Sequence, residues 1–541
     1  MKKRISKAFA LGLTLALVCT AFPAPALAAG QDDLTLEVTE RTINHYRGFP
    51  KAVNQTIEEA SALAQKDGKI RTVKVAPGTY EVYSGIELLS NVTLDMRGVT
   101  MKRERTDNLI HVGDNDEFDS GVTGYYYQNI KVIGGTYDCS YGSNTGIKAA
   151  HVRNFTMDGC TVKNTKDAHL MEIAGCDGFN MVNCTFMNQT TAKSKKFYEA
   201  VQLDVLAEKH FKTYRVEAIP MKNVNISGCS FINVPRGVGS HTGIFNAPFT
   251  NINITNNIFK DNQSAAIQGT NWQNVNISGN TITGSPRGIT ILSVNARGGK
   301  DNASGTFLPS YFAKRGGVKT SIPSGYRAPA KDMKISITGN TISLSNKNDP
   351  LADYEKMGIL VNGAKVTKKQ SYSDKSGNIP KGTYTLNGVT ISGNKIVSGG
   401  HGIRATYVKN CKITGNNISR TPKAKFKSTV YGVHVTVGAK NVSISKNTIG
   451  KGFDKGIAVT KKGAAGNITS NTVGKCKQRG ITLEKGKAGK IAGNKILGAG
   501  QYGISLTLGS KASLVKGNTL QKCKKKINIS GNSKAKVKGN K

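Results

Sequence analysis

The stretch Asn274-Val-Asn-Ile-Ser-Gly-Asn280 decides the fold, because near copies of it recur as Lys334-Ile-Ser-Ile-Thr-Gly-Asn340 and Gly388-Val-Thr-Ile-Ser-Gly-Asn394. The final Asn can be followed further along the chain, where its last four steps are 24, 23, 24 and 22 residues. The aligned positions run through Cys160, Cys184, Cys229, Asn257, Asn280, Asn340, Asn394, Asn416, Asn447, Asn471, Asn494, Asn518 and Asn540. A period of this length is typical of a solenoid, in which each repeat forms one turn, or rung, of a coil.

Within each repeat, Val, Ile and Thr alternate with polar residues over a few positions, which favours short strands over helices. Such strands cannot bury a face alone, but parallel stacking of the rungs gives every strand a partner and fills one continuous core. The recurring Asn can bond to backbone and to the next Asn, forming a ladder. We therefore predict an all-β, single-domain parallel β-helix over residues 29–541, whose rungs are most regular and lysine-rich over 356–541.

This fold changes how two common motifs are interpreted. The Asn-x-Ser/Thr triplets at Asn225, Asn253 and Asn276 resemble glycosylation sites but fall on predicted strands. The mature cysteines include no Cys-x-x-Cys pair, so neither a zinc site nor a disulfide framework is predicted. Cys160, Cys184 and Cys229 lie in the asparagine column and should stack as small buried groups, with a bridge between neighbouring rungs as the alternative.

The N-terminus has the form of a secretory signal peptide. Basic residues over 2–7 precede an apolar stretch over 8–22, and Ala26-Leu-Ala28 matches a cleavage site. After this leader no apolar run reaches the ~18 residues that a membrane span needs. We therefore predict removal of residues 1–28 and a secreted protein.

The mature chain should begin with a cap. Ala52 to Ala64 carries apolar residues at helical spacing, and we predict a capping helix over 49–68 that closes the open end of the coil. Thr72-Val-Lys-Val-Ala-Pro-Gly-Thr-Tyr80 and Ser90-Asn-Val-Thr-Leu-Asp95 follow. This order of helix, Pro-Gly-Thr-Tyr strand and Ser-Asn-Val-Thr-Leu resembles the start of the polygalacturonase and pectate-lyase (pectin-lyase-like) superfamily. The resemblance extends over nearly all of the mature chain and implies a right-handed parallel β-helix.

Outward side chains of such a coil line up in columns from rung to rung. We register the strands on their apolar positions to obtain three columns. They are His169, Glu199, Arg236, Ala265 and Arg287; Glu172, Gln202, Gly239, Gln268 and Thr290; and Ala174, Asp204, His241, Thr270 and Leu292. In the C-terminal rungs the equivalent positions Thr406, Thr436, Thr460 and Thr507 indicate a plain stack.

This concentration of ionisable groups predicts a polysaccharide site. Glu172, Glu199 and Asp204 are the candidate acid and base, and the diagonal pairs Glu172–Glu199 and Glu172–Asp204 should lie about 8 Å apart, as in inverting glycosidases. The candidates for binding substrate are His169, Gln202, Arg236, His241, Gln268 and Arg287. Arg236 and Arg287 could hold a sugar carboxylate bidentately, and Arg236, His241 or His169 is the candidate base of a lyase. The alternative is that these groups only neutralise one another on a solvated face.

Insertions point to the same rungs. Excursions from the repeat occur at 187–199, 205–222, 295–333 and 343–357. The third contains residues able to stack on sugars and hold anions, or else is a disordered surface loop. These residues are Phe307, Tyr311, Phe312, Lys314, Arg315 and Tyr326.

The resemblance to polygalacturonases is incomplete at the motifs that carry their activity. Asn164-Thr-Lys-Asp167 and Gly400-His-Gly402 match that family's pattern in part, and no Asp-Asp pair occurs. Two hypotheses therefore remain for function. The chain cleaves an acidic polysaccharide, as hydrolase or lyase, or it is a non-catalytic surface or wall-binding module.

The charge distribution predicts a polyanionic partner. The chain carries a formal net charge of +42, and residues 356–541 alone hold 37 Lys and Arg against three acidic residues. Stacked like charges repel unless a polyanion lies along them, so we expect an acidic polysaccharide or another polyanion such as wall teichoic acid, and retention at the cell surface. Export argues against nucleic acid. No cofactor is predicted; calcium at Asp114-Asn-Asp-Glu-Phe-Asp119 is the alternative, although this stretch lacks the Gly and final Glu of an EF-hand loop.

Overall fold

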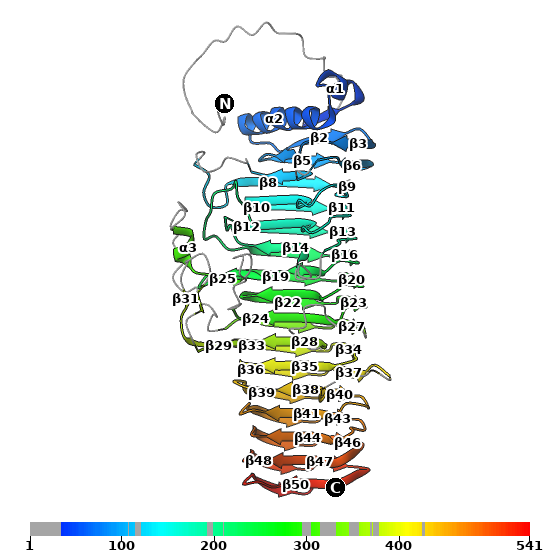
Figure 1. The fold of residues 1–541 in the computed structure, drawn as a ribbon, viewed down its shortest axis with the longest axis vertical. Coiled ribbons are helices and arrows are strands. Elements are labelled where there is room, and N and C mark those ends of the chain that lie inside the picture. Colours follow the sequence, from blue (N-terminus) through cyan, green and yellow to red (C-terminus); the bar gives the residue numbers. More distant parts are fainter. Residues whose placement is uncertain are drawn as a thin grey trace.

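The computed structural model is an elongated parallel β-solenoid (Figure 1). It describes residues 34–541 except 106–107, 114–120, 192–197, 209, 295–304, 314–331, 346–355, 368–369, 372–377, 423 and 425–427. The predicted signal peptide and the stretch 114–119 considered for calcium lie outside the described residues, as do Lys314, Arg315 and Tyr326. The predicted all-β solenoid is confirmed.

Three faces, each a column of parallel strands, enclose the core. The first face, which we call the site face, consists of β4 (Ile86–Leu88), β7 (Ile110–Val112), the first half of β10 (Ile147–Asp158) and of β12 (Met171–Val182), β14 (Glu199–Asp204), β17 (Arg236–Gly239), β21 (Ala265–Thr270), β24 (Arg287–Leu292), β28 (Met357–Asn362), β35 (His401–Thr406), β38 (Tyr431–Val435), β41 (Lys455–Thr460), β44 (Arg479–Glu484), β47 (Ala499–Thr507) and β50 (Cys523–Ile529). Each of these strands pairs with the equivalent strand one rung on.

The second face uses the remaining strands of the same sheet. These are β1 (Thr35–Val38), β2 (Arg71–Val75), β5 (Val92–Asp95), β8 (Tyr127–Ile133), the second halves of β10 and β12, β15 (Lys222–Ser227), β19 (Phe249–Thr255), β22 (Trp272–Ser278), β26 (Ile335–Thr338), β33 (Leu386–Ser392), β36 (Val408–Thr414), β39 (Lys440–Ser445), β42 (Ala465–Thr469), β45 (Lys487–Ala492), β48 (Lys511–Lys516) and β51 (Lys534–Lys538).

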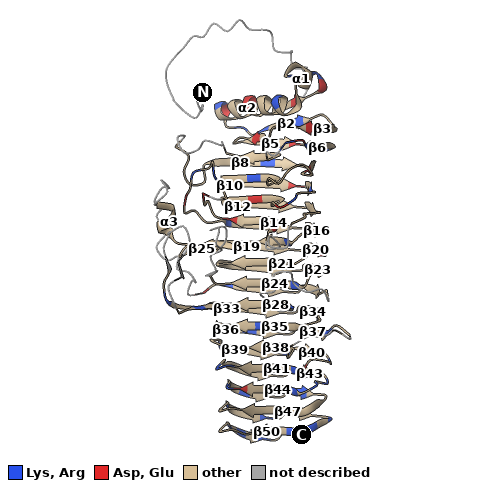
Figure 2. Ribbon diagram, viewed as in Figure 1, with Lys and Arg blue, Asp and Glu red and all other residues tan. Residues whose placement is uncertain are grey.

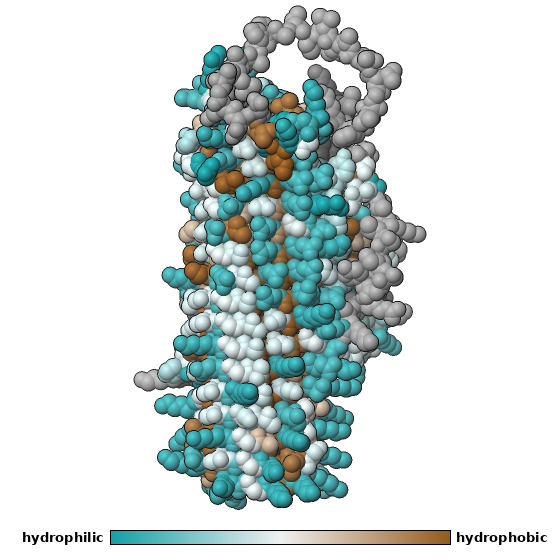
Figure 3. Space-filling view, turned by 180° about the vertical axis from the view of Figure 1, so that it is seen from behind, coloured by the Kyte–Doolittle hydropathy of each residue, from teal (hydrophilic) through white to brown (hydrophobic). Residues whose placement is uncertain are grey.

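The third face is a separate sheet of short strands. It contains β3 (Gly78–Val82), β6 (Val99–Arg103), β9 (Thr136–Asp138), β11 (Thr161–Lys163), β13 (Thr185–Met187), β16 (Ser230–Ile232), β20 (Ile258–Lys260), β23 (Thr281–Thr283), β27 (Thr341–Ser343), β34 (Lys395–Ser398), β37 (Asn417–Arg420), β40 (Thr448–Ile449), β43 (Thr472–Val473), β46 (Lys495–Ile496) and β49 (Thr519–Leu520). Because the rungs are in register, side chains of one kind run in rows along the long axis, as Figure 3 shows from behind.

The core and the corner ladder follow the predicted pattern. Stacked rings fill part of the interior, with Phe231 4.8 Å from Phe259 between ring centroids. At the buried corner each Asn bonds to the next: Asn340 Nδ2 donates to Asn394 Oδ1 at 2.9 Å, and the Asn280 backbone N–H donates to Asn340 Oδ1 at 3.0 Å. Cys160, Cys184 and Cys229 continue this column as buried free thiols. The positions Asn225, Asn253 and Asn276 lie on paired strands, as expected.

Helices cap the N-terminal end. The predicted capping helix is confirmed as α2 (Phe49–Asp67), which lies across the end of the coil in Figure 1 and buries Val53, Ile57 and Ala60. A shorter helix, α1 (Glu40–His45), precedes it and begins with a capping box formed by Thr39 and Thr42. Among the described residues there is no helix whose length and apolar character would let it cross a membrane.

The insertions fold against the coil. Residues 205–222 pack on the site face through the cluster Ala150, Ala174, Leu206, Phe211, Tyr214 and Ile219. Another insertion forms β25 (Gly305–Phe307), paired with β18 (Thr242–Ile244), and helix α3 (Pro309–Ala313). Two further pairs are β29 (Ala364–Val366) with β32 (Gly382–Tyr384), and β30 (Gln370–Ser371) with β31 (Asn378–Ile379).

Candidate functional site

The predicted register of the outward columns is confirmed wherever the strands pair. Glu172 lies opposite Gln202, and Ala174 lies opposite Asp204. One rung on, Glu199 lies opposite Arg236. The columns then continue through the pairs Arg236–Ala265, Gly239–Gln268, Ala265–Arg287 and Gln268–Thr290. The repeat therefore brings residues more than a hundred positions apart onto one wall.

This wall is covered rather than open to solvent. All nine predicted site residues are less than a tenth exposed, from 0% for Glu199, Gln202, Asp204 and Arg287 to 7% for His169. The 205–222 insertion contributes to this burial, because its Phe211 and Tyr214 pack against Ala150 and Ala174 on the site face. The sequence predicts a solvated face because nothing in the repeat indicates where an insertion will dock.

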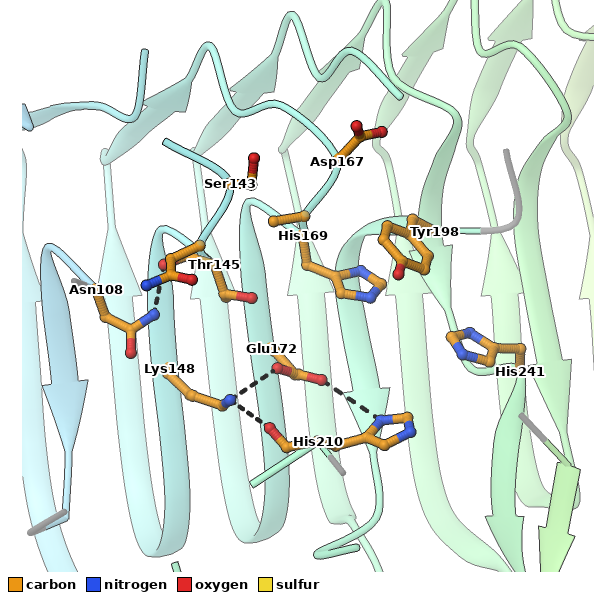
Figure 4. A pocket seen from close by; sticks show the side chains of 12 residues that line it. Asn108, Ser143, Thr145, Lys148, Asp167, His169, Glu172, Tyr198, His210 and His241 are labelled. Carbon is orange, nitrogen blue, oxygen red and sulfur yellow. Dashed lines mark hydrogen bonds and ion pairs between the residues drawn. The ribbon is translucent and has the colours of Figure 1, made fainter. Parts of the chain in front are cut away.

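A cleft of about 330 Å³ lies on this wall (Figure 4). We call it the histidine cleft, because His169, His210 and His241 line it. The predicted Glu172 lines it too, together with Lys148 and Tyr198. Its volume is at the lower end of the range for small-molecule sites. Of the three predicted catalytic carboxylates, only Glu172 reaches the cleft, whereas Glu199 and Asp204 lie behind its lining.

Glu172 belongs to a compact charge network. His210 donates from Nδ1 to Asp204 Oδ2, and the same nitrogen is 3.6 Å from Glu172 Oε1. Lys148 Nζ is 3.3 Å from Glu172 Oε2 and donates to the His210 backbone oxygen. One ligand atom each of Glu172, Asp204 and His210 lies within 4.8 Å of the others. The predicted 8 Å separation of Glu172 and Asp204 is therefore wrong, because both carboxylates converge on one imidazole.

The charge states in this network follow from its neighbours. Burial would raise the pKa of Glu172, but Lys148 and His210 hold it well below its usual range. Burial would lower the pKa of His210, but Asp204 and Glu172 outweigh it and raise that pKa to about 10. At neutral pH Glu172 is therefore a carboxylate and His210 an imidazolium, and each lies against a partner of opposite charge, Lys148 and Asp204.

Glu172, Asp204 and His210 are the group of metal-ligating type that the described residues bring together. A divalent cation there would have to displace the His210 proton and lie beside the Lys148 ammonium. The charge that a metal would supply is thus already present, so the arrangement fits an ion-pair network better than a metal centre.

Unlike His210, which is protonated, His169 is a neutral imidazole. Its Nδ1–H donates to the Glu199 backbone oxygen at 2.6 Å, and burial lowers its pKa. With Nδ1 carrying the proton, Nε2 holds a lone pair and can accept a proton. The ring stacks on Tyr198, with 4.6 Å between ring centroids. A base and a phenol therefore lie side by side in the cleft.

Behind the lining, Glu199 binds Arg236 and also His241, whose ring itself lines the cleft. Arg236 Nη1 donates to Glu199 Oε1 at 3.1 Å, and His241 Nδ1 donates to Glu199 Oε2 at 2.9 Å. Burial would raise the pKa of Glu199, yet His241 and Arg236 lower it to about 2. Arg236, predicted to hold a sugar carboxylate, instead holds this internal one.

The remaining predicted binding residues lie away from the cleft. Neither side-chain amide atom of Gln202 has a hydrogen-bond partner among the described residues, and the same holds for Gln268 Oε1. Arg287 is fully buried and donates to Ser264 Oγ at 3.0 Å. None of the three lines the histidine cleft.

Several functional residues were missed from sequence. Lys148 shares the column of Glu172 one rung earlier, so extension of the register would have found it. His210 and Tyr198 stand on insertions or their edges, where no repeat signal exists. The aromatic residues expected to stack on sugars are instead packed inside: Phe307, Tyr311 and Phe312 are at most 4% exposed and contact one another.

A family model supports the fold independently. The model described as "Right handed beta helix region" matches residues 140–297 and 358–541, more than half of the chain. The chain belongs to the right-handed β-helix family. This confirms the handedness and the β-helix resemblance predicted from sequence.

Solved structures match the chain at low identity. PfbA, a surface adhesin of Streptococcus pneumoniae, is 16% identical, with 84% of this chain and 88% of that chain covered and a TM-score of 0.48. A tailspike protein mutant of E. coli bacteriophage HK620, in complex with a pentasaccharide, is 12% identical, with 89% and 76% covered and a TM-score of 0.43. No curated protein matches the sequence. Similarities of this size say nothing about what the chain binds.

Proposed function

We propose that this protein cleaves an acidic polysaccharide by β-elimination in the histidine cleft. The observation that carries the proposal is the state of His169, a neutral imidazole whose Nδ1–H is bound to backbone and whose Nε2 can accept a proton. β-Elimination needs such a base beside a uronate. His169 Nε2 takes the proton from the carbon next to the carboxylate, and that bond's electrons form a carbon–carbon double bond. The glycosidic carbon–oxygen bond then breaks, and the leaving oxygen takes a proton.

Two neighbours suit the other requirements of this step. Lys148 Nζ contacts Glu172, the His210 backbone oxygen and the Phe211 ring, 4.7 Å from its centroid, and its positive charge is the one that would neutralise a substrate carboxylate. Neutralising that carboxylate makes the adjacent proton more acidic. Tyr198, stacked on His169, is the candidate proton donor to the leaving oxygen.

Hydrolysis by a carboxylate pair is supported less well. A glycosidase acid must hold its proton at working pH, which requires a raised pKa. Here the pKa values of Glu172 and Glu199 are both lowered. Asp204 is fully buried and bound to His210 and Thr242. We therefore assign Glu199 and Asp204 to positioning the histidines rather than to contact with substrate.

A second function is favoured by a different observation. Many exposed lysines lie on the C-terminal rungs, where they form the blue segments in the lower part of Figure 2. They suit a polyanion-binding or adhesion module at the cell surface. Such a module would be exported by the predicted signal peptide and retained by charge, with acidic polysaccharide or wall teichoic acid as its partner. It needs no chemistry in the histidine cleft.

The test is product analysis on a panel of acidic polysaccharides. Wild type should release fragments that carry both a new reducing end and the ultraviolet absorbance of an unsaturated uronate. His169→Gln keeps a donor for the Glu199 backbone oxygen but removes the base, so kcat should fall by about 10²–10⁴ with an unchanged unfolding midpoint. The control is His45→Gln on the exposed helix α1, which should retain activity.

Two other outcomes would contradict β-elimination. Reducing ends without unsaturated product would indicate a hydrolase and contradict β-elimination. Glu172→Gln should then abolish activity, whereas in a lyase it should leave the product unsaturated. No product from any polysaccharide, with the fold intact, would leave only the binding module.

A further inference from the structure

A second cleft lies on the same outward columns as the histidine cleft, but on the C-terminal rungs. It has a volume of about 440 Å³ and is lined by Arg404, Tyr431, His434, Lys461, Glu484 and Lys485, among others. We call it the C-terminal cleft. The column of Glu172 and Gln202 continues through Gln268, Thr290, Leu360 and Arg404 to His434. The sequence predicts only a plain threonine stack here, and the structure corrects this: Glu484 stands between Thr460 and Thr507.

The C-terminal cleft carries excess positive charge. The acidic residue in its lining, Glu484, is paired with two cations. Lys455 Nζ lies 2.6 Å from Glu484 Oε1, and Arg479 donates to the same oxygen. Lys461 and Lys485 are exposed at its rim. In the histidine cleft, by contrast, Glu172 and Asp204 offset Lys148 and His210, and Asp167 adds another carboxylate to the lining. The C-terminal cleft therefore favours an anionic ligand.

The same cleft offers a rigid aromatic surface. Tyr431 stacks on His434 with 4.0 Å between ring centroids and on His401 with 5.3 Å. His434 is in turn held by Thr460, 2.9 Å from Nε2 to Oγ1. Leu508, 59% exposed, adds an apolar group to the lining. Aromatic and apolar groups beside a few charges are typical of a small-molecule subsite and suit the apolar face of a sugar ring.

We propose that the C-terminal cleft is a second binding site for acidic polysaccharide, in which a sugar ring rests against the Tyr431–His434 pair and Leu508 and its carboxylate binds Lys461 and Lys485. From β12 to β38 the site face advances by seven rung spacings, or about 34 Å. One polymer lying along the coil can therefore reach both clefts, which raises its apparent affinity. The inference that one polymer reaches both clefts rests on the proposed function, whereas binding in the C-terminal cleft does not.

The test measures binding of polygalacturonate in the His169→Gln background, so that no cleavage interferes. Lys461→Gln with Lys485→Gln should weaken binding roughly tenfold or more at low salt. The matched control is Lys511→Gln with Lys516→Gln, which removes the same charge from exposed positions of β48 outside the cleft. That control should change affinity by less than about twofold. Tyr431→Leu, which keeps bulk but removes the ring, should also weaken binding.

Other results would overturn the proposal. Equal losses in the two lysine pairs would show that overall charge, and not the cleft, binds the polymer. Equal binding of neutral dextran would exclude an anion site, and tighter binding of a polyol-phosphate polymer would exclude a sugar acid as the ligand. If polygalacturonate binds here but wild type never cleaves it, only the proposed lyase function fails.

Discussion

The asparagine ladder shows how one residue type stabilises a whole coil. Each buried Asn accepts a bond from the backbone N–H of the previous ladder residue and donates to a carbonyl on a neighbouring rung, as Asn340 does with Asn280 and Ile277. From Asn257 onward, the corner backbone N–H groups are thus satisfied without water. The ladder begins only where Cys229 gives way to Asn257, so the earlier rungs close this corner with thiols.

Asn340→Ala should lower the free energy of unfolding by roughly 2–4 kcal/mol, because the Asn280 N–H and the Ile277 carbonyl lose their partners in the interior. The measurement is the midpoint of denaturant unfolding. Asn276→Ala, at a half-buried position of β22, should change stability by no more than about 0.5 kcal/mol. Equal losses at both positions would contradict a special role for the ladder.

His210 should make stability depend on alkaline pH. Its pKa is about 10 in the folded protein and about 6.5 when unfolded, so its ion pairs stabilise fully below pH ~6.5. As pH rises towards 10 this contribution is lost, at up to about 1.4 kcal/mol per pH unit. The thermal midpoint of wild type should therefore fall across this window, and that of His210→Gln should fall less.

Comparison with His45→Gln controls for other groups that titrate in the same range. Identical pH profiles for wild type and His210→Gln would contradict an imidazolium between Glu172 and Asp204. His169 titrates with the opposite sign and at lower pH, because its folded pKa is lowered. The two histidines can therefore be separated by pH alone.

Among the elements, the insertions and the cap decide what the coil exposes. The 205–222 insertion packs on Ala150 and Ala174 of the site face and delivers His210, and α2 covers the first rung. Phe49 of α2 stacks on Tyr80 with 4.0 Å between ring centroids. A solenoid without such a cap would expose an apolar cross-section.

Ile57→Ala in α2 should destabilise the N-terminal rungs by about 2–5 kcal/mol, because it leaves a cavity at a fully buried position. Limited proteolysis should then cut near the N-terminus sooner than in wild type. Leu63→Ala, 38% exposed on the same helix, should have little effect. Faster proteolysis in both variants would indicate loss of helicity rather than loss of packing.

At the scale of the whole molecule, charge is distributed along the long axis. Acidic residues gather in the N-terminal half of Figure 2, and lysines dominate the last rungs. Lys511 lies opposite Lys534, and Lys516 lies opposite Lys538, so like charges stack at rung spacing. This repulsion lowers stability until salt or a polyanion screens it.

The thermal midpoint should rise with ionic strength between about 0.01 and 1 M, because the Debye length falls from about 30 to 3 Å. Lys534→Gln with Lys538→Gln should raise the low-salt midpoint and reduce its salt dependence. A midpoint that does not change with salt would contradict the proposed repulsion.

The sequence by itself determined the coil, its cap and its register. Recurrent Asn positions and alternating apolar residues leave one way to stack the rungs, because a slip by one residue would turn every core side chain outward. Hence the sequence predicts the correct columns for Glu172, Gln202 and Arg236.

Only the tertiary structure decided which of these residues face a cleft. That depends on where the insertions dock, and Leu206, Phe211 and Tyr214 have no equivalent in the repeat to indicate their position. It also depends on side-chain partners: His210 draws Glu172 and Asp204 together, and Glu199 retains Arg236. Periodicity fixes the backbone, whereas burial and charge pairing across long separations select the site.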